Sequence, residues 1–199
     1  MVEWKNAIFR VFSGWKTLLL GIIISIVPIL NFATYGFALE CARKPYDKKL
    51  PSWRRFGTLW VQGLLAIIIM VLYALPAAIA ALFSFAVPEE NAVFIFIIAG
   101  ILGLLAYYFL PMAWLAYALG DFRAAFDFGH VMRKCLRLKY VGVWLVVLIV
   151  SFIIALVLNF LSFAIAITII GPFIIAGVIG FWLSVLAFTI YGQLYEELR

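Results

Sequence analysis

Residues 59–86 read LWVQGLLAIIIMVLYALPAAIAALFSFA and contain no acidic or basic side chain. About 20 consecutive apolar residues are enough for an α-helix to cross roughly 30 Å of hydrocarbon. This segment therefore predicts a membrane-spanning helix.

Working outward, four more apolar stretches of similar length occupy residues 17–39, 92–119, 141–163 and 172–191. Of the 199 residues, 68% are hydrophobic and only 12% are charged. A soluble domain has roughly 45–50% apolar and about 25% charged residues. The composition predicts an all-α, polytopic membrane bundle that forms one membrane domain over residues 1–199.

Basic residues are concentrated in short connections rather than spread along the chain. The formal net charge is +6, and the cations gather at residues 43–55 and 123–139. Because these clusters sit between apolar runs, they indicate anionic lipid head groups as partners and not nucleic acid. Positive loops face the cytoplasm. The pattern predicts a multi-pass protein of the cell membrane with both termini cytoplasmic.

The first apolar stretch, residues 17–39, is interrupted by Pro28 and Asn31 near its middle. Proline breaks the helical hydrogen-bond ladder, and asparagine tolerates a turn. Two half-helices of about 11 residues each reach only about half way across a bilayer. We therefore expect four spanning helices plus a re-entrant N-terminal hairpin. The alternative is five spanning helices, since proline also occurs within spans.

Three segments, residues 1–16, 51–62 and 122–138, have an apolar stripe opposite a polar or basic one. Such amphipathic helices lie in the membrane interface, with cations at the head groups. The residues expected to contact lipid head groups are Lys5, Arg10, Lys16, Arg54, Arg55, Arg133, Lys134 and Arg137.

Few polar residues fall within or beside the apolar stretches, and they are candidates for a polar membrane site. They are Asn31, Glu40 and Asn159. Each asparagine could instead bond a neighbouring helix, and Glu40 could pair at the interface. A second pattern consists of small residues spaced by four, which allows close helix packing. It comprises Ala176, Gly180 and Ser184.

No catalytic constellation or metal-ligand motif emerges. His130 lies three residues from Asp127, which could orient it, but no nucleophile is placed beside them. Cys41 and Cys135 lack a partner motif and are expected to be free thiols. The sequence predicts no enzyme activity, no metal and no cofactor.

Several short motifs occur along most of the chain. They are Pro28-Ile29-Leu30-Asn31, Tyr35-Gly36-Phe37, Leu50-Pro51-Ser52-Trp53, Phe56-Gly57, Val61-Gln62-Gly63, Leu110-Pro111-Met112-Ala113 and Ala124-Ala125-Phe126-Asp127. With these motifs the chain resembles a prokaryotic membrane family known as domain-of-unknown-function family 4013. The resemblance implies a multi-helix membrane protein and supplies no activity or ligand.

Taken together, these features favour a non-enzymatic membrane protein that organises lipid, or an unidentified membrane-protein partner, through a basic cytoplasmic face. The alternative is a small transporter or channel for a hydrophobic or lipid-like substrate. A path for polar solutes needs a polar lining, which the apolar stretches lack. We therefore expect no continuous polar channel, and we expect Asn31 and Asn159 to be bonded within the protein.

Overall fold

The computed structural model describes residues 2–164 and 171–198, with the side chains of residues 158, 159, 161–164 and 171–176 outside that description. Within the described residues the chain forms eight α-helices and three short 3-10 turns, and it forms no strand. The predicted all-α class is confirmed.

Two long helical hairpins supply the four helices that are long and apolar enough to span a membrane. The first pairs α4 (Phe56–Ser84) with α5 (Glu89–Leu119), and the second pairs α7 (Leu138–Ala164) with α8 (Gly171–Glu197). Each coincides with a predicted apolar stretch. Glu89 and Glu90 occupy the first turn of α5, where acidic side chains interact favourably with the helix dipole.

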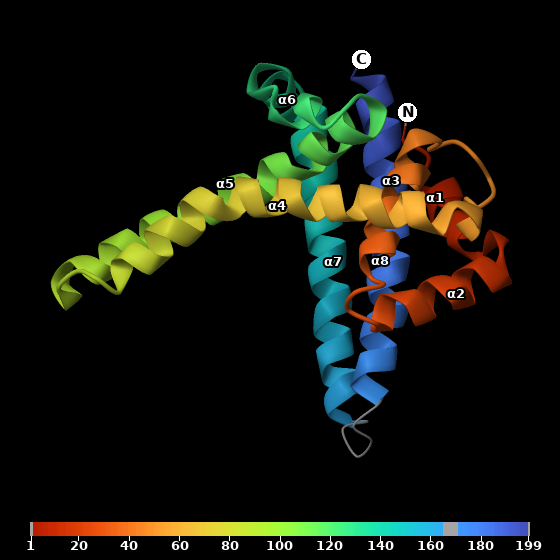
Figure 1. Ribbon diagram of the computed structural model, residues 1–199, viewed down its shortest axis with the longest axis horizontal. Coiled ribbons are helices and arrows are strands. Elements are labelled where there is room, and N and C mark those ends of the chain that lie inside the picture. The colour runs from red at the N-terminus through yellow and green to blue at the C-terminus, as the bar shows by residue number, and fades with distance from the viewer. Residues whose placement is uncertain (1, 165–170, 199) are drawn as a thin grey trace.

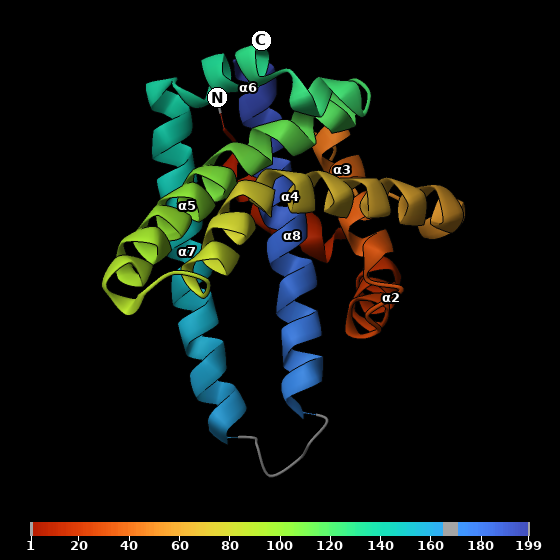
Figure 2. The same cartoon turned by 60° about the vertical axis from the view of Figure 1, so that its left-hand side comes forward.

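The two hairpins point in different directions. In Figure 1, α7 and α8 run vertically, while α4 and α5 extend sideways from the upper part of that pair. Figure 2 shows the same divergence after rotation. In that view α6 and the C-terminus lie together at the top, at the end where the two hairpins meet. If both hairpins cross one bilayer, at least one of them crosses it at a pronounced tilt.

The N-terminal third is a chain of short helices. These are α1 (Trp4–Arg10), the 3-10 turn η1 (Val11–Ser13), α2 (Trp15–Ile26) and α3 (Phe32–Arg43). The segments Trp4–Ser13 and Trp15–Ile26 are bent by 86° relative to each other, and together they could count as a fifth span.

The predicted break at Pro28 and Asn31 is present, because α2 ends at Ile26 and α3 starts at Phe32. Each of these helices has 12 residues, or about 18 Å of rise, which is too short to cross the hydrocarbon alone. Both pack against α8. The first apolar stretch therefore does not form one continuous helix.

The basic segment 122–138 is not the single amphipathic helix that its periodicity predicted. It contains the 3-10 turn η3 (Arg123–Phe126) and then α6 (Phe128–Cys135). The helix restarts because the Asp127 carboxylate accepts a hydrogen bond from the backbone N–H of His130 at 3.0 Å, which caps α6. The segment 51–62 likewise does not form an amphipathic helix of its own. Its 3-10 turn η2 (Trp53–Arg55) leads directly into the long helix α4.

The core lies where α3, α8 and the adjoining parts of α4, α5 and α7 meet. Fully buried side chains there include Leu39, Met112, Leu115, Tyr140 and Leu194. Farther out, α4, α5 and α7 expose large apolar side chains such as Phe94, Phe152 and Phe160. In a bilayer these faces contact lipid. The core extends from the end with the basic loops along α8 as far as the buried Phe181.

Candidate functional site

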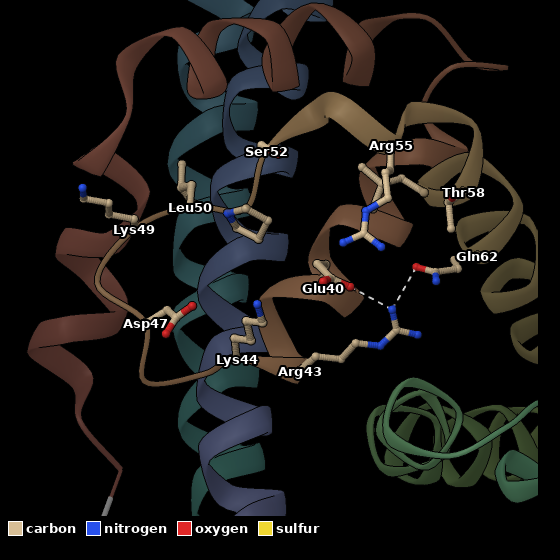
Figure 3. Close-up of a pocket in the computed structure, with 12 residues that line it drawn as sticks. Glu40, Arg43, Lys44, Asp47, Lys49, Leu50, Ser52, Arg55, Thr58 and Gln62 are labelled. Carbon is tan, nitrogen blue, oxygen red and sulfur yellow. Dashed lines mark hydrogen bonds and ion pairs between the residues drawn. The ribbon is translucent and has the colours of Figure 1, made fainter.

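A hollow of about 380 Å³ opens between the end of α3, the loop that follows it and the start of α4. Figure 3 shows side chains from all three parts converging on it. We call it the basic hollow. It is lined by Glu40, Arg43, Lys44, Asp47, Lys49, Leu50, Pro51, Ser52, Arg55, Thr58, Leu59 and Gln62.

The charge of the basic hollow is positive. Four cations against two carboxylates give a formal charge of +2, and the Ser52 and Thr58 hydroxyls add neutral hydrogen-bonding groups. The hollow also adjoins the N-terminus of α4, whose first N–H groups and dipole favour an anion. The combination is suited to a phosphate group, which accepts several hydrogen bonds and carries negative charge.

Arg43 is the most firmly held of the lining cations. Its guanidinium donates to the Glu40 carboxylate at 2.8 Å, to the Gln62 side-chain oxygen at 3.2 Å and to the Ala118 carbonyl at 2.7 Å. Arg43 therefore ties α3 to α4 and α5, and it fixes one wall of the hollow.

The other three cations behave differently. The side chains of Lys44, Lys49 and Arg55 are exposed and make no hydrogen bond or ion pair with the residues that the structure describes. In Figure 3 the Arg55 guanidinium points toward the centre of the hollow, above Glu40. These three side chains are available to an external anion.

The expectation that Arg10 contacts lipid head groups is wrong. Arg10 is only 2% exposed. Its guanidinium donates to the carbonyls of Cys41 at 3.1 Å and Lys49 at 3.3 Å, and to the Thr189 hydroxyl at 3.3 Å. Cys41 lies in the last turn of α3, so Arg10 satisfies a helix end that carries partial negative charge.

Lys134 is also turned inward, which corrects a second expected head-group contact. It is 6% exposed, and its ammonium group lies 3.4 Å from the centroid of the Tyr195 ring and donates to the Tyr195 carbonyl at 3.3 Å. The remaining six predicted cations are exposed: Lys5, Lys16, Arg54, Arg55, Arg133 and Arg137.

Only Arg55 among those six lines the basic hollow. Arg133 and Arg137 lie instead in a smaller hollow of about 200 Å³ with His130 and Lys134. Sequence reasoning did not select Arg43, Lys44 and Lys49 as individual site residues. The signal that could have found them was the excess of positive charge in residues 43–55.

The candidate polar membrane residues do not form one site. Glu40 belongs to the basic hollow and pairs there with Arg43. Asn31 lines a different hollow, together with Gly180 and Ser184. The side chains of Asn159 and Ala176 lie outside the described residues.

The Asn31 side chain makes no hydrogen bond with any residue that the structure describes, so the expectation that it is bonded within the protein is wrong. Its backbone does take part in the turn, since Asn31 N–H donates to the Val27 carbonyl at 2.8 Å. The unpaired amide instead lines the hollow beside α8.

The two hollows have different lining residues on α3. Successive residues of an α-helix turn by about 100°. On that spacing Thr34 and Tyr35 lie about 120° and about 140° around α3 from Glu40, and no residue lines both hollows. The two hollows are therefore separate features of the described residues.

Asp127 and His130 make separate contacts. Asp127 contacts the backbone of His130, whereas the His130 ring lies 3.0 Å from the Tyr195 hydroxyl.

Burial raises the pKa of the Cys41 thiol to about 12, and burial likewise raises the pKa of Cys135 to about 12. No group of metal-ligating side chains occurs among the described residues.

Four long apolar helices, an exposed apolar surface and a polar end with two cationic hollows define a multi-pass membrane protein. A family model described as "Protein of unknown function (DUF4013)" matches residues 19–163. The chain belongs to that family, as its motifs indicated. No curated protein and no solved structure matched the chain.

Proposed function

We propose that this protein is a non-enzymatic membrane protein that holds anionic lipid through its basic end, with the lipid phosphate bound in the basic hollow. The observation that carries the proposal is the set of three unpaired cations, Lys44, Lys49 and Arg55, around a hollow at a helix N-terminus. Each cation near an anionic surface contributes about 1 kcal/mol to binding.

The position of the hollow supports this role. It adjoins the loop that joins α3 to the first long span, where lipid head groups meet the protein. Trp53 lies in the same region, and its indole N–H donates to the Thr17 carbonyl at 3.0 Å. Tryptophan is enriched at the membrane–water boundary.

The proposal includes an orientation. The basic end faces the cytoplasm, which places both termini there, in the cell membrane. In this arrangement α2 and α3 form a re-entrant hairpin whose tip, at residues 27–31, lies within the bilayer against α8. The turn backbone at the tip must then be covered by protein, since exposed polar backbone is costly in hydrocarbon.

A second candidate function is transport of a hydrophobic or lipid-like substrate. The observation that favours it is the polar hollow at the break between α2 and α3, because transporters use broken helices to build binding sites. Against it stands the separation of that hollow from the basic one.

The proposal is tested by lipid binding to the purified full-length chain in neutral nanodiscs. The variant Lys44→Gln/Lys49→Gln/Arg55→Gln should bind fluorescent phosphatidylglycerol roughly 100-fold more weakly, from the loss of about 1 kcal/mol for each of the three cations. The matched control, Lys5→Gln/Lys16→Gln/Arg54→Gln, removes the same charge from exposed positions outside the hollow.

An equal loss of lipid affinity in the two triple variants would contradict a defined binding site. It would indicate that the lipid is attracted by the overall positive charge. Equal binding of phosphatidylglycerol and phosphatidylcholine would contradict selection of an anionic lipid. Soluble glycerol phosphate serves as competitor, and it should compete poorly if the ligand is a lipid rather than a free phosphate ester.

A further inference from the structure

A second hollow, of about 260 Å³, lies where the break between α2 and α3 meets the middle of α8. We call it the neutral hollow, because none of its lining residues carries a charge. It is lined by Ser25, Ile26, Asn31, Thr34, Tyr35, Gly177, Gly180 and Ser184.

Its hydroxyl groups are arranged to accept hydrogen bonds. Ser25 donates to the Gly21 carbonyl at 2.7 Å, and Ser184 donates to the Gly180 carbonyl at 2.7 Å. Both side chains thus use their own protons within their helices, and the Ser25 oxygen also lies 3.3 Å from the Thr34 hydroxyl. Each serine oxygen can still accept a hydrogen bond. Asn31 offers both a donor and an acceptor, since its amide is unpaired within the described chain.

Measured along α3 and α8, the neutral hollow lies away from Arg43 and Glu197, although Gly36, next to Tyr35, packs against Leu59 at the start of α4. Nine residues of α3 separate Thr34 from Arg43, a rise of about 14 Å, and thirteen residues of α8 separate Ser184 from Glu197, about 20 Å. Glu197 marks the basic end, because it pairs with Lys139 at 2.5 Å. At such a depth along a spanning helix the surroundings are acyl chains, so the polar groups have little access to bulk water.

The neutral hollow is open on the side formed by α8. Gly180 is exposed, and a side chain built on it would meet no atom within 4 Å. Beside the hollow, the tip of the break exposes the apolar side chains of Val27 (41%) and Ile29 (68%). A ligand can therefore enter sideways from the lipid and rest its apolar part on this tip.

We propose that the neutral hollow binds the hydroxyl end of an uncharged lipid, of the diacylglycerol type. An ionic head group would lose its hydration there without meeting an opposite charge. A lipid hydroxyl can donate to the Ser25 or Ser184 oxygen and accept from the Asn31 amide. This site is distinct from the basic hollow in place, charge and ligand.

The test uses the full-length chain in nanodiscs and a photoreactive diacylglycerol whose diazirine is near the head. Cross-links mapped by mass spectrometry should fall on residues 25–35 and 177–184. Gly180→Leu fills the hollow from the open side and should reduce this labelling at least fivefold. Gly142→Leu is the matched control, since Gly142 is also an exposed helical glycine with open space around it, on α7.

Asn31→Leu is a second variant and should also reduce labelling, with an unchanged thermal transition showing that it folds. Labelling that Gly180→Leu leaves unchanged would overturn the proposal. Equal labelling by a photoreactive phosphatidylcholine would also overturn it. The absence of any label at these segments would overturn it as well, and would leave water as the occupant of the hollow.

Discussion

Gly36 on α3 and Gly63 on α4 each lie against the backbone of the other helix. A side chain built on Gly36 would overlap the Leu59 carbonyl, and one built on Gly63 would overlap the Phe32 carbonyl. Each glycine thus faces the residue four positions before the other. Glycine at such a crossing lets two helices approach to backbone contact, and this contact positions the two walls of the basic hollow.

Replacing either glycine by alanine should destabilise the protein. The obstructing atoms are backbone atoms, which cannot rotate away, so we expect a loss of about 1–3 kcal/mol in the free energy of unfolding. The measurement is denaturant-induced unfolding in micelles. Gly100→Ala is the control, because a side chain there would meet nothing within 4 Å. Equal stability of Gly36→Ala and Gly100→Ala would refute the close approach.

Removing the buried Arg10 side chain should also destabilise the fold. Arg10→Met leaves the Cys41 and Lys49 carbonyls without their donor, and an unsatisfied buried acceptor costs about 1–3 kcal/mol. Lys5→Met removes one exposed cation from the same helix and should be nearly neutral. If the two variants unfold at the same denaturant concentration, Arg10 is not the tie between α1 and α3 described above.

The two native thiols should resist alkylation on either side of the membrane. Both thiols are buried, and burial raises the pKa of Cys41 and Cys135 to about 12, so almost no reactive thiolate is present at pH 8. An impermeant maleimide should therefore label neither in intact cells nor after permeabilisation, until denaturant is added. Rapid labelling of the folded protein would show that one of these sites opens.

Orientation is better tested with introduced thiols in a cysteine-free background. Lys48 lies in the basic loop and Asn91 at the distal turn of the α4–α5 hairpin, and both are exposed. Lys48→Cys should react with the impermeant maleimide only after permeabilisation, whereas Asn91→Cys should react in intact cells. The reverse pattern would place the basic end outside.

Two tyrosine hydroxyls should hold the segment between α5 and α7 in place. Tyr73 donates to the Ala125 carbonyl at 2.6 Å, and Tyr108 donates to the Cys135 carbonyl at 2.5 Å. Tyr73→Phe/Tyr108→Phe should lose about 1 kcal/mol per bond and loosen this segment. Limited trypsin digestion should then cut faster after Arg123 and Arg133.

Tyr107→Phe is the control for that digestion, because Tyr107 is half exposed and its hydroxyl bonds to no described residue. An unchanged cleavage rate in the double variant would indicate that ring packing, and not the hydroxyls, holds the segment.

The sequence predicts the long helices well because each rests on a local property. An uninterrupted apolar run such as residues 59–86 forms a helix in a bilayer. Proline, as at position 28, interrupts the hydrogen bonding of a helix whatever surrounds it. The class, the four long helices and the broken first stretch all follow from such local features.

The burial of Arg10 could not be predicted in the same way. Periodicity places Arg10 on the polar stripe of α1, but its partners Cys41 and Thr189 lie 31 and 179 residues away. Only the packing of α1 against α8 reveals that this stripe faces protein. The hollows are equally non-local: the charge excess of residues 43–55 was visible, but the meeting of Asn31 with Gly180 depends on the whole fold.

The divergence of the two hairpins gives the protein an asymmetric profile in a bilayer. Near the basic end the helices are gathered around one core, whereas farther out the α4–α5 and α7–α8 pairs separate and expose apolar side chains such as Leu104 and Phe152. Acyl chains must fill the angle between the separated pairs. If both pairs lie within one bilayer, the protein would displace different amounts of lipid from the two leaflets.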